Sequence, residues 1–175
     1  MIFDEVIFRD EKIFFDFDNS NIILRNAVRA VIADKNKILM VFLGKTKEYK
    51  FPGGGMENNE TIEEALNREV LEEIGHKINK IGEKIGTITE YSIAKEGNNN
   101  IFKMVSEYYT VKIDKNKTEQ SLDEYEKELK FKPIWIETET AYKINKSLIE
   151  NKHDLTPWIK RETRVLEILK DMINE

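Results

Sequence analysis

Three glutamates within five residues give this chain its clearest candidate for chemistry. Glu69, Glu72 and Glu73 stand at positions i, i+3 and i+4, which places them on one side of a helix. Like charges at this spacing repel and cost an isolated helix about 0.2–0.5 kcal/mol per pair. A hard divalent cation would offset this repulsion, because such ions prefer carboxylate and carbonyl oxygens. The cluster therefore predicts a metal site.

The segment from Gly54 to His76 resembles the Nudix box, the signature of MutT-like hydrolases that cut nucleoside diphosphates linked to another moiety. His76 stands where the family usually has a bulky aliphatic residue, and this departure leaves every acid of the box in place. The positions that match the box are Gly54, Glu60, Arg68, Glu69, Val70, Glu72, Glu73 and Gly75.

This resemblance implies an α/β (α+β) fold, the Nudix-type α/β/α sandwich with a mixed β-sheet between helices. It also implies a nucleotide pyrophosphatase, in which a divalent metal ion assists water to cleave a pyrophosphate bond. The expected substrate is a small nucleotide, either a nucleoside triphosphate in its normal or oxidised form or an ADP-ribose-like nucleotide sugar. Mg²⁺ is the expected ion, with Mn²⁺ as the alternative. Dimers are frequent in this family, so a homodimer is a further expectation.

The resemblance also assigns roles within the box. The expected metal ligands are Glu69, Glu72, Glu73 and the backbone carbonyl of Gly53. Either Glu69 or Glu72 would orient or deprotonate the attacking water, and the sequence does not separate these two roles. The alternative is that these acids bind no metal and form a solvated acidic face of the helix.

Arg68 is the third residue expected near the reaction. Its guanidinium group would hold a carboxylate in place, with Glu60 as its partner across the loop. The alternative is a direct contact between Arg68 and the substrate. Gly54, in the loop after Pro52, would let the backbone turn tightly and approach the metal.

Some family members recruit a further acid from a distant loop. The candidates by position are Asp114, Glu119, Asp123, Glu124 and Glu126, although solvated loop acids are far commoner. A nucleobase would stack on an aromatic side chain, but an aromatic residue in a strand usually belongs to the core. The available aromatic residues are Phe42, Tyr91, Tyr108, Tyr109 and Trp135, and none is assigned to the substrate. His76 and His153 show no spacing typical of metal ligands.

A helix from Thr61 to Ile74 must position the acids. Thr61 can cap its first turn with Glu64 as the capping-box partner, and Gly75 can end it. One apolar face should pack on the core, formed by Ile62, Leu66, Val70 and Ile74. Glu69 and Glu73 lie beside this apolar face, so we expect the acids at the edge of the buried side.

The remaining elements follow from apolar runs and turn residues. Residues 1–25 should form a strand or hairpin extension, and residues 27–33 and 38–43 a hairpin. Further strands are expected over 49–52, 85–93, 102–113 and 133–136, with a turn at 96–100 and a polar loop at 114–121. Helices are expected over 137–152 and from 156 to about 173.

The length and composition of the chain argue against several other classes of protein. A chain of 175 residues is most simply one domain, 1–175. Its net charge of −5 argues against a broad nucleic-acid-binding surface, and it contains no cysteine for a disulfide or thiolate site. The acidic start does not resemble a signal peptide, and no apolar run is long enough for a membrane span. A cytoplasmic location is therefore the default expectation.

Two other functions compete with the hydrolase. A non-catalytic Nudix-like domain would bind nucleotides as a sensor or regulator, but such domains usually have broken boxes, and this box keeps all its acids. A structural interaction module would use helices 137–173 as its docking surface. That hypothesis requires an exposed apolar face formed by Trp158, Ile159, Val165, Leu166, Leu169 and Met172.

Overall fold

The computed structural model describes residues 1–9, 21–94, 100–151 and 154–173. Within these ranges the strands form two four-stranded sheets. The first has the order β1-β6-β7-β2, with β6 and β7 antiparallel to each other and β1 and β2 parallel to their neighbours. It is therefore a mixed sheet. Its strands are β1 (Phe3–Phe8), β2 (Asn21–Val31), β6 (His76–Ile93) and β7 (Asn100–Lys117).

The second sheet is antiparallel and centres on β4, which pairs with β8 along its length and with β3 and β5 on its other edge. Its strands are β3 (Ala33–Asp34), β4 (Lys37–Leu43), β5 (Tyr49–Lys50) and β8 (Phe131–Glu137). The helices are α1 (Ile62–Ile74), α2 (Glu124–Leu129), α3 (Thr138–Asn151) and α4 (Ile159–Ile173).

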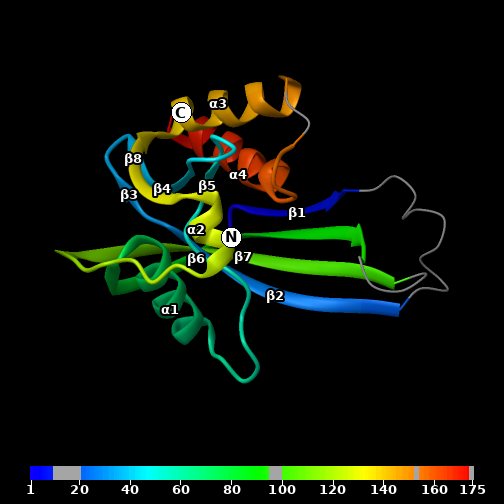
Figure 1. Cartoon of the computed structure of the whole chain (residues 1–175), viewed down its shortest axis with the longest axis horizontal. Coiled ribbons are helices and arrows are strands. Elements are labelled where there is room, and N and C mark those ends of the chain that lie inside the picture. The colour runs from blue at the N-terminus through cyan, green and yellow to red at the C-terminus, as the bar shows by residue number, and fades with distance from the viewer. Residues whose placement is uncertain (10–20, 95–99, 152–153, 174–175) are drawn as a thin grey trace.

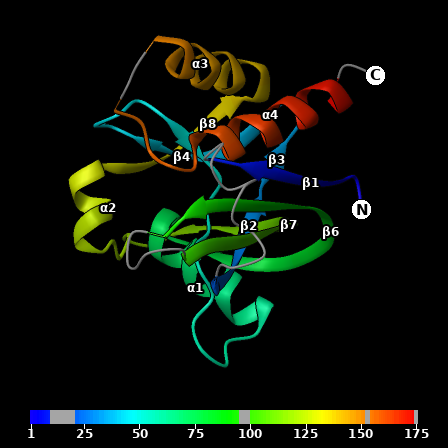
Figure 2. The ribbon, with the colours of Figure 1, turned by 90° about the vertical axis from the view of Figure 1, so that its right-hand side faces the viewer.

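Helices cover both sides of the sheets (Figure 1). The α1 helix lies on one side of the mixed sheet, and α3 and α4 lie on the opposite side beside the second sheet, as Figure 2 shows from another direction. The α/β/α arrangement with a mixed sheet between helices is thus confirmed. The strands belong to two sheets, a division that the sequence did not indicate.

Two apolar clusters form the core. One joins both sheets to α3 and α4 and includes Tyr108, Phe51 and Leu166. The other joins α1 to β2, β4 and β7 and includes Leu66, Val70 and Val28. The face of α4 that carries Val165 and Leu166 is fully buried, and of the apolar residues named for a docking surface Met172 is exposed, at 46%. Most of that face therefore packs on the protein instead of forming a free docking surface.

The predicted hairpin of residues 27–33 and 38–43 is wrong in its main pairing. Ala33–Asp34 pairs with β4, but β2 pairs along its whole length with the distant strand β7. Turn residues at 34–37 determine only the local reversal of the chain. Residues 27–31 are buried on both faces, and the long strand β7 provides the partner that such a strand needs.

Other differences concern the ends of elements. Two strands are longer than expected: β6 begins at His76, and β7 extends to Lys117, into the region expected to be a loop. The charged residues in these parts of the strands do not follow the apolar pattern on which the prediction depended. The short helix α2 was missed, although Asp123 and Glu126 form a capping box that marks its start. Predicted structure over residues 10–20 and 95–99 lies outside the described residues. None of the helices in the described ranges is long and apolar enough to cross a membrane.

Candidate active site

Capping contacts determine the ends of α1, and its apolar residues determine which face turns toward the core. Thr61 accepts a hydrogen bond from the Glu64 amide at 3.2 Å, and the Thr61 amide donates to the Glu64 carboxylate at 2.8 Å. Gly75 closes the helix in the left-handed conformation, with φ of 70°. The expected apolar face is buried except at its first residue, Ile62, which is 37% exposed. The adjacent acids are therefore drawn partly into the interior.

The glycine loop that faces α1 is bonded to the edge of β2. The Val28 amide donates to the Gly54 carbonyl at 3.0 Å, and the Ala30 amide donates to the Pro52 carbonyl at 2.8 Å. Farther along, the Met56 amide donates to the Asn26 carbonyl at 2.9 Å. These bonds fix residues 52–56 against the mixed sheet.

Gly53 brings this loop into contact with Glu73. Its amide donates to the Glu73 carboxylate at 2.9 Å, and its carbonyl oxygen accepts hydrogen bonds from Lys50, at 3.2 Å, and from Arg29. Glu73 is 2% exposed and also accepts a hydrogen bond from the Lys50 ammonium group. Two of the expected metal-binding oxygens, one from a carbonyl and one from a carboxylate, thus share a cationic neighbour.

The burial of Glu73 changes the pKa of its carboxyl group. Burial raises the pKa of its carboxyl group from the ordinary 4.5 to about 7, while Lys50 acts in the opposite direction and Glu69 adds to the rise. Any carboxylate in this position is stabilised by added positive charge. The environment of Glu73 therefore favours a cation.

Glu69 lies against Gly54 at the other end of the loop. It is 7% exposed, and it accepts a hydrogen bond from Arg68 at 2.7 Å. A Cβ atom on Gly54 would overlap both carboxylate oxygens of Glu69. The glycine is thus required for this close approach. Glu72 is the most open of the three acids, with a side chain that is 40% exposed.

Arg68 joins the acids to the loop. Its guanidinium group grips Glu60 with two hydrogen bonds of 2.7 and 2.8 Å, and it donates to the Gly55 carbonyl at 3.2 Å. The same group lies 3.4 Å from Glu72. Such a forked, charge-assisted arrangement is both strong and directional. Arg68 and Glu60 therefore act as a support behind Glu69 and Glu72.

The sequence profile of the NUDIX domain matches residues 23–159, well over half of the chain. The chain belongs to the Nudix family. This match confirms the resemblance drawn from the box, and it extends over α1, α2, α3 and the strands of both sheets except β1. No curated protein matches the sequence significantly.

Solved structures show the same fold. The chain is similar to the solution structure of the E. coli ORF135 protein, with 19% identity, a TM-score of 0.53, and coverage of 89% of this chain and 93% of that one. It is also similar to a Nudix hydrolase from Nitrosomonas europaea, with 20% identity, a TM-score of 0.50, and coverage of 86% and 88%. At these identities the likeness establishes the fold.

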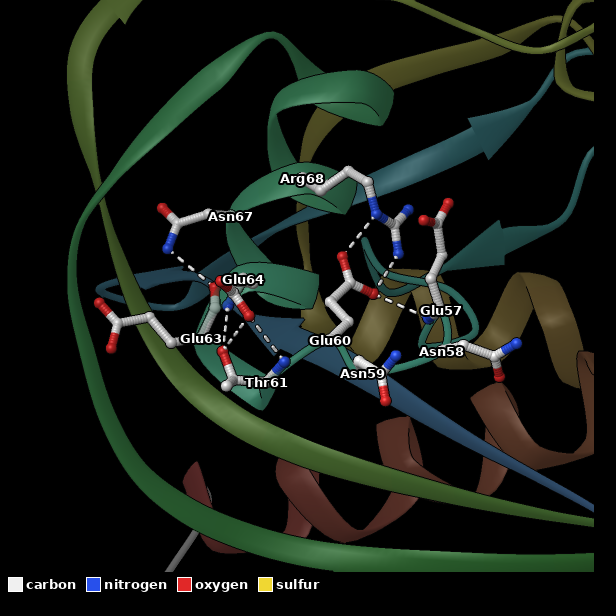
Figure 3. A pocket seen from close by; sticks show the side chains of 9 residues that line it. All are labelled: Glu57, Asn58, Asn59, Glu60, Thr61, Glu63, Glu64, Asn67 and Arg68. Atoms are coloured by element: carbon white, nitrogen blue, oxygen red, sulfur yellow. Dashed lines mark hydrogen bonds and ion pairs between the residues drawn. The ribbon is translucent and has the colours of Figure 1, made fainter.

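An open, polar pocket lies at the start of the Nudix helix (Figure 3). Arg68 and Glu60 are among its lining residues, and Figure 3 shows their paired hydrogen bonds. Its lining is formed by Glu57, Asn58, Asn59, Glu60, Thr61, Glu63, Glu64, Asn67 and Arg68. Because polar side chains surround it, this pocket does not resemble an apolar site for a nucleobase.

Among the acids outside the Nudix box, Glu126 on α2 is within electrostatic reach of the site. Burial raises the pKa of its carboxyl group, Lys50 lowers it and Glu69 raises it. Asp123 instead caps α2 by accepting a hydrogen bond from the Glu126 amide at 2.7 Å. Glu119 and Glu124 are exposed, and Asp114 is half-buried near the end of β7. His153 lies outside the described residues.

The aromatic candidates other than Trp135 make contacts within the protein. Tyr108 is fully buried and packs edge-on against Phe3 and Phe51. Tyr91 stacks on Phe8, Phe42 packs on Tyr49, Tyr109 donates a hydrogen bond to Glu107, and Trp135 is 42% exposed. Phe131, which sequence reasoning missed, lies next to the site, with its ring 5.0 Å from the Lys50 ammonium group.

Nudix hydrolases generally use divalent metal ions, and the donors in this site fit such an ion. Glu69, Glu73 and the Gly53 carbonyl offer hard oxygen atoms, and Lys50, Arg29 and Arg68 already donate to these oxygens. Within the described residues, no group of three acidic or histidine side chains is arranged to hold an ion together. The box carboxylates are instead directed to their cationic partners.

Sequence reasoning missed three residues that complete this arrangement. Lys50 and Arg29 bond the Gly53 carbonyl, and Gln120 donates a hydrogen bond to the Glu73 carbonyl. Arg29 and Gln120 come from segments distant from α1 in the sequence, and Lys50 lies before the glycine loop, outside the box. No fixed spacing links them to the box, so only the folded structure reveals them.

Proposed function

We propose that this protein hydrolyses a pyrophosphate bond in a nucleoside diphosphate linked to another moiety, using Mg²⁺, with Mn²⁺ as a substitute. The observation that carries this proposal is the contact between the glycine loop and the two buried acids. Gly53 and Gly54 lie against Glu73 and Glu69, respectively, so carboxylate and carbonyl oxygens gather at one edge of α1. The substrate class comes from the family: a nucleoside triphosphate, normal or oxidised, or an ADP-ribose-like nucleotide sugar.

The oxygens of Glu69, Glu72, Glu73 and Gly53 would hold the ion. When bound, the ion would supply charge neutralisation at the phosphates and a lower pKa for water. Arg68 keeps Glu69 in place, and the loop bonded to β2 holds the Gly53 carbonyl. These contacts pre-organise the site before substrate arrives, which is the protein's main contribution to phosphoryl transfer.

Glu72 is our choice for the group that accepts a proton from the attacking water. It is the most exposed of the three clustered acids Glu69, Glu72 and Glu73, and burial of its carboxyl group raises its pKa, with Arg68 opposing the rise and Glu69 adding to it. A raised pKa suits a general base. Glu69 is the alternative within the box, and Glu126 is the alternative outside it.

The competing function is a non-catalytic domain that binds nucleotides. An intact box favours the hydrolase. A screen of nucleotide pyrophosphates with Mg²⁺, scored for phosphate or pyrophosphate and nucleoside monophosphate, distinguishes the two. Turnover of at least one compound is expected, and binding without turnover of any compound would support the sensor instead.

Substitution of the buried acids tests the assignment of the site. We expect Glu69→Gln and Glu73→Gln each to lower kcat at least about 100-fold, since each removes a charge from the reacting centre. Glu63→Gln is the matched control, because Glu63 is exposed in the first turn of the same helix, and it should keep wild-type activity. Wild-type turnover by either buried variant would show that the metal ligands are assigned wrongly.

A further inference from the structure

The Lys50 ammonium group is bound by two of the proposed metal ligands. Its side chain is 6% exposed, and it donates hydrogen bonds to the Glu73 carboxylate and, at 3.2 Å, to the Gly53 carbonyl oxygen. A cation that belongs to the chain is thus held by one carboxylate and one carbonyl of the site.

Buried charges persist only when they are paired, and Lys50 is the partner that keeps Glu73 paired. The other charged groups nearby do not replace it. Arg29 reaches the Gly53 carbonyl, Arg68 is bonded to Glu69 and Glu60, and Glu126 is a further acid within reach of Lys50. Lys50 therefore neutralises the innermost acid of the box.

A divalent ion and the ammonium group cannot share these two oxygens without strong repulsion, which is large for charges in a protein interior. The four-carbon stem of lysine is flexible, so the ammonium group can leave. The ring of Phe131 already lies 5.0 Å from the ammonium group, so it provides a cation–π contact that does not involve the two oxygens.

We propose that Lys50 is a built-in competitor of the metal ion: it occupies the Glu73 carboxylate and the Gly53 carbonyl, and so weakens and regulates metal loading. This inference rests on the proposed function, because it takes these two oxygens as metal ligands. Metal entry at Glu73 then requires Lys50 to release both of them.

The first test measures Mn²⁺ binding without substrate, from the electron paramagnetic resonance signal of free Mn²⁺. Lys50→Met keeps the length of the stem and removes the charge, and Lys50→Gln is a second variant in case the first folds poorly. At pH 8.5, we expect each to tighten the Kd for Mn²⁺ at least about tenfold. Unchanged or weaker binding in the folded variants would overturn the proposal.

The matched control is Lys84→Met. Lys84 is a partly buried lysine that, like the more buried Lys50, forms an ion pair, here with Glu107 between β6 and β7, so its substitution removes the same charge away from the box. Its Kd should stay within about twofold of the wild-type value. An equal gain in this variant would assign the effect to net charge and would also overturn the proposal.

The second test uses the wild-type protein and needs no variant. Acetylation of lysines by an amine-reactive reagent is measured by mass spectrometry with and without saturating Mg²⁺. Labelling of Lys50 relative to Lys84 should rise several-fold with metal, because Lys50 loses its two oxygen partners. A ratio that does not change would contradict the proposal.

These outcomes separate the two proposals. If neither the wild-type protein nor Lys50→Met binds Mn²⁺, the metal centre itself is wrong and both proposals fail. If the wild-type protein binds Mn²⁺ and hydrolyses a nucleotide while Lys50→Met binds Mn²⁺ unchanged, only the competition by Lys50 fails.

Discussion

Two neighbouring glycines of the loop exclude a side chain for different reasons. Gly53 has φ of 132°, and a Cβ atom there would overlap the backbone carbonyl of Val28. Gly54 would direct its Cβ atom into the carboxylate of Glu69. The first glycine is therefore required by the backbone, and the second is required by the site.

This difference can be measured with two alanine variants. Gly53→Ala should lower the free energy of unfolding by about 1–3 kcal/mol, the usual cost of a strained backbone conformation. Gly54→Ala should unfold near the wild-type urea concentration but lose at least about tenfold in kcat, because Glu69 must move. If Gly54→Ala keeps its kcat, the position of Glu69 against the loop is not needed for the reaction.

At the scale of residues, the sequence predicted contacts that depend on spacing along one segment. The pairing of Arg68 with Glu60 was predicted, because both residues belong to the box and Glu60 lies in the loop directly before the helix that carries Arg68. Lys50 could not be paired with Glu73 in the same way, because its position depends on how β5 packs against α1. Only assembly of the whole fold determines that contact.

At the scale of elements, the helix that carries the box was predicted almost to the residue. Thr61, Glu64 and Gly75 form its caps through hydrogen bonds within a few residues, so local sequence is sufficient. The pairing of β2 with β7 was not predicted, since an apolar run reveals burial and does not identify a partner strand. The Asp123 capping box could have revealed α2, but the helix has only six residues.

Arg164 joins α4 to β1 and gives this contact a dependence on pH. It donates to Glu5 at 2.6 and 2.7 Å and to Glu167 at 2.6 Å. The hydrogen bonds from Arg164 hold the pKa of Glu5 below its ordinary 4.5. The folded state therefore binds fewer protons at Glu5 than the unfolded state, and the stabilisation is present above the ordinary pKa and lost as pH falls through the lowered one.

We expect Glu5→Gln to remove this part of the acid sensitivity. Because the pair is partly exposed, its contribution is about 0.2–1 kcal/mol. Between about pH 5 and pH 3, the wild-type free energy of unfolding should therefore fall more than that of the variant by this amount. The measurement is urea denaturation at several pH values. If the free energy of unfolding falls equally with pH in the two proteins, the contact does not stabilise the fold.

At the scale of the molecule, one buried set of charges joins three layers. Arg161 on α4 is 1% exposed and bonds Glu90 on β6 and its neighbour Glu162. Glu162 also accepts a hydrogen bond from the Phe51 amide at 2.9 Å, next to the glycine loop. The mixed sheet, the second sheet and the last helix are thus connected through Arg161.

Arg161→Met should lower the free energy of unfolding by about 3–5 kcal/mol, because two buried carboxylates lose their buried guanidinium partner, although Glu90 keeps a second one, Arg9. Arg164→Met, three residues along the same helix, should cost about 1 kcal/mol or less, because its ion pairs are partly exposed. Urea denaturation of the two variants compares a buried arginine with a more open one. Equal losses would mean that the buried set is not a stabilising connection.

The contacts of β1 and α4 support the proposal that residues 1–175 form one domain. The NUDIX profile matches residues 23–159, which leaves β1 and most of α4 outside it. Yet β1 pairs with β6, and α4 places Val165 and Leu166 in the core cluster that includes Phe51. Both β1 and α4 therefore pack on the matched region.

The bonding of the glycine loop to β2 has a consequence for the order of folding. Val28 bonds Gly54, while β2 itself is held by parallel pairing with β7, where Val28 faces Glu107. Pairing between segments so distant in the chain forms slowly, because the entropy of a long loop must be overcome first. The acids of α1 lie on a helix with local start and stop signals, but the carbonyl that faces them depends on this slow pairing. We therefore expect catalytic competence to be among the last properties that the refolding chain acquires.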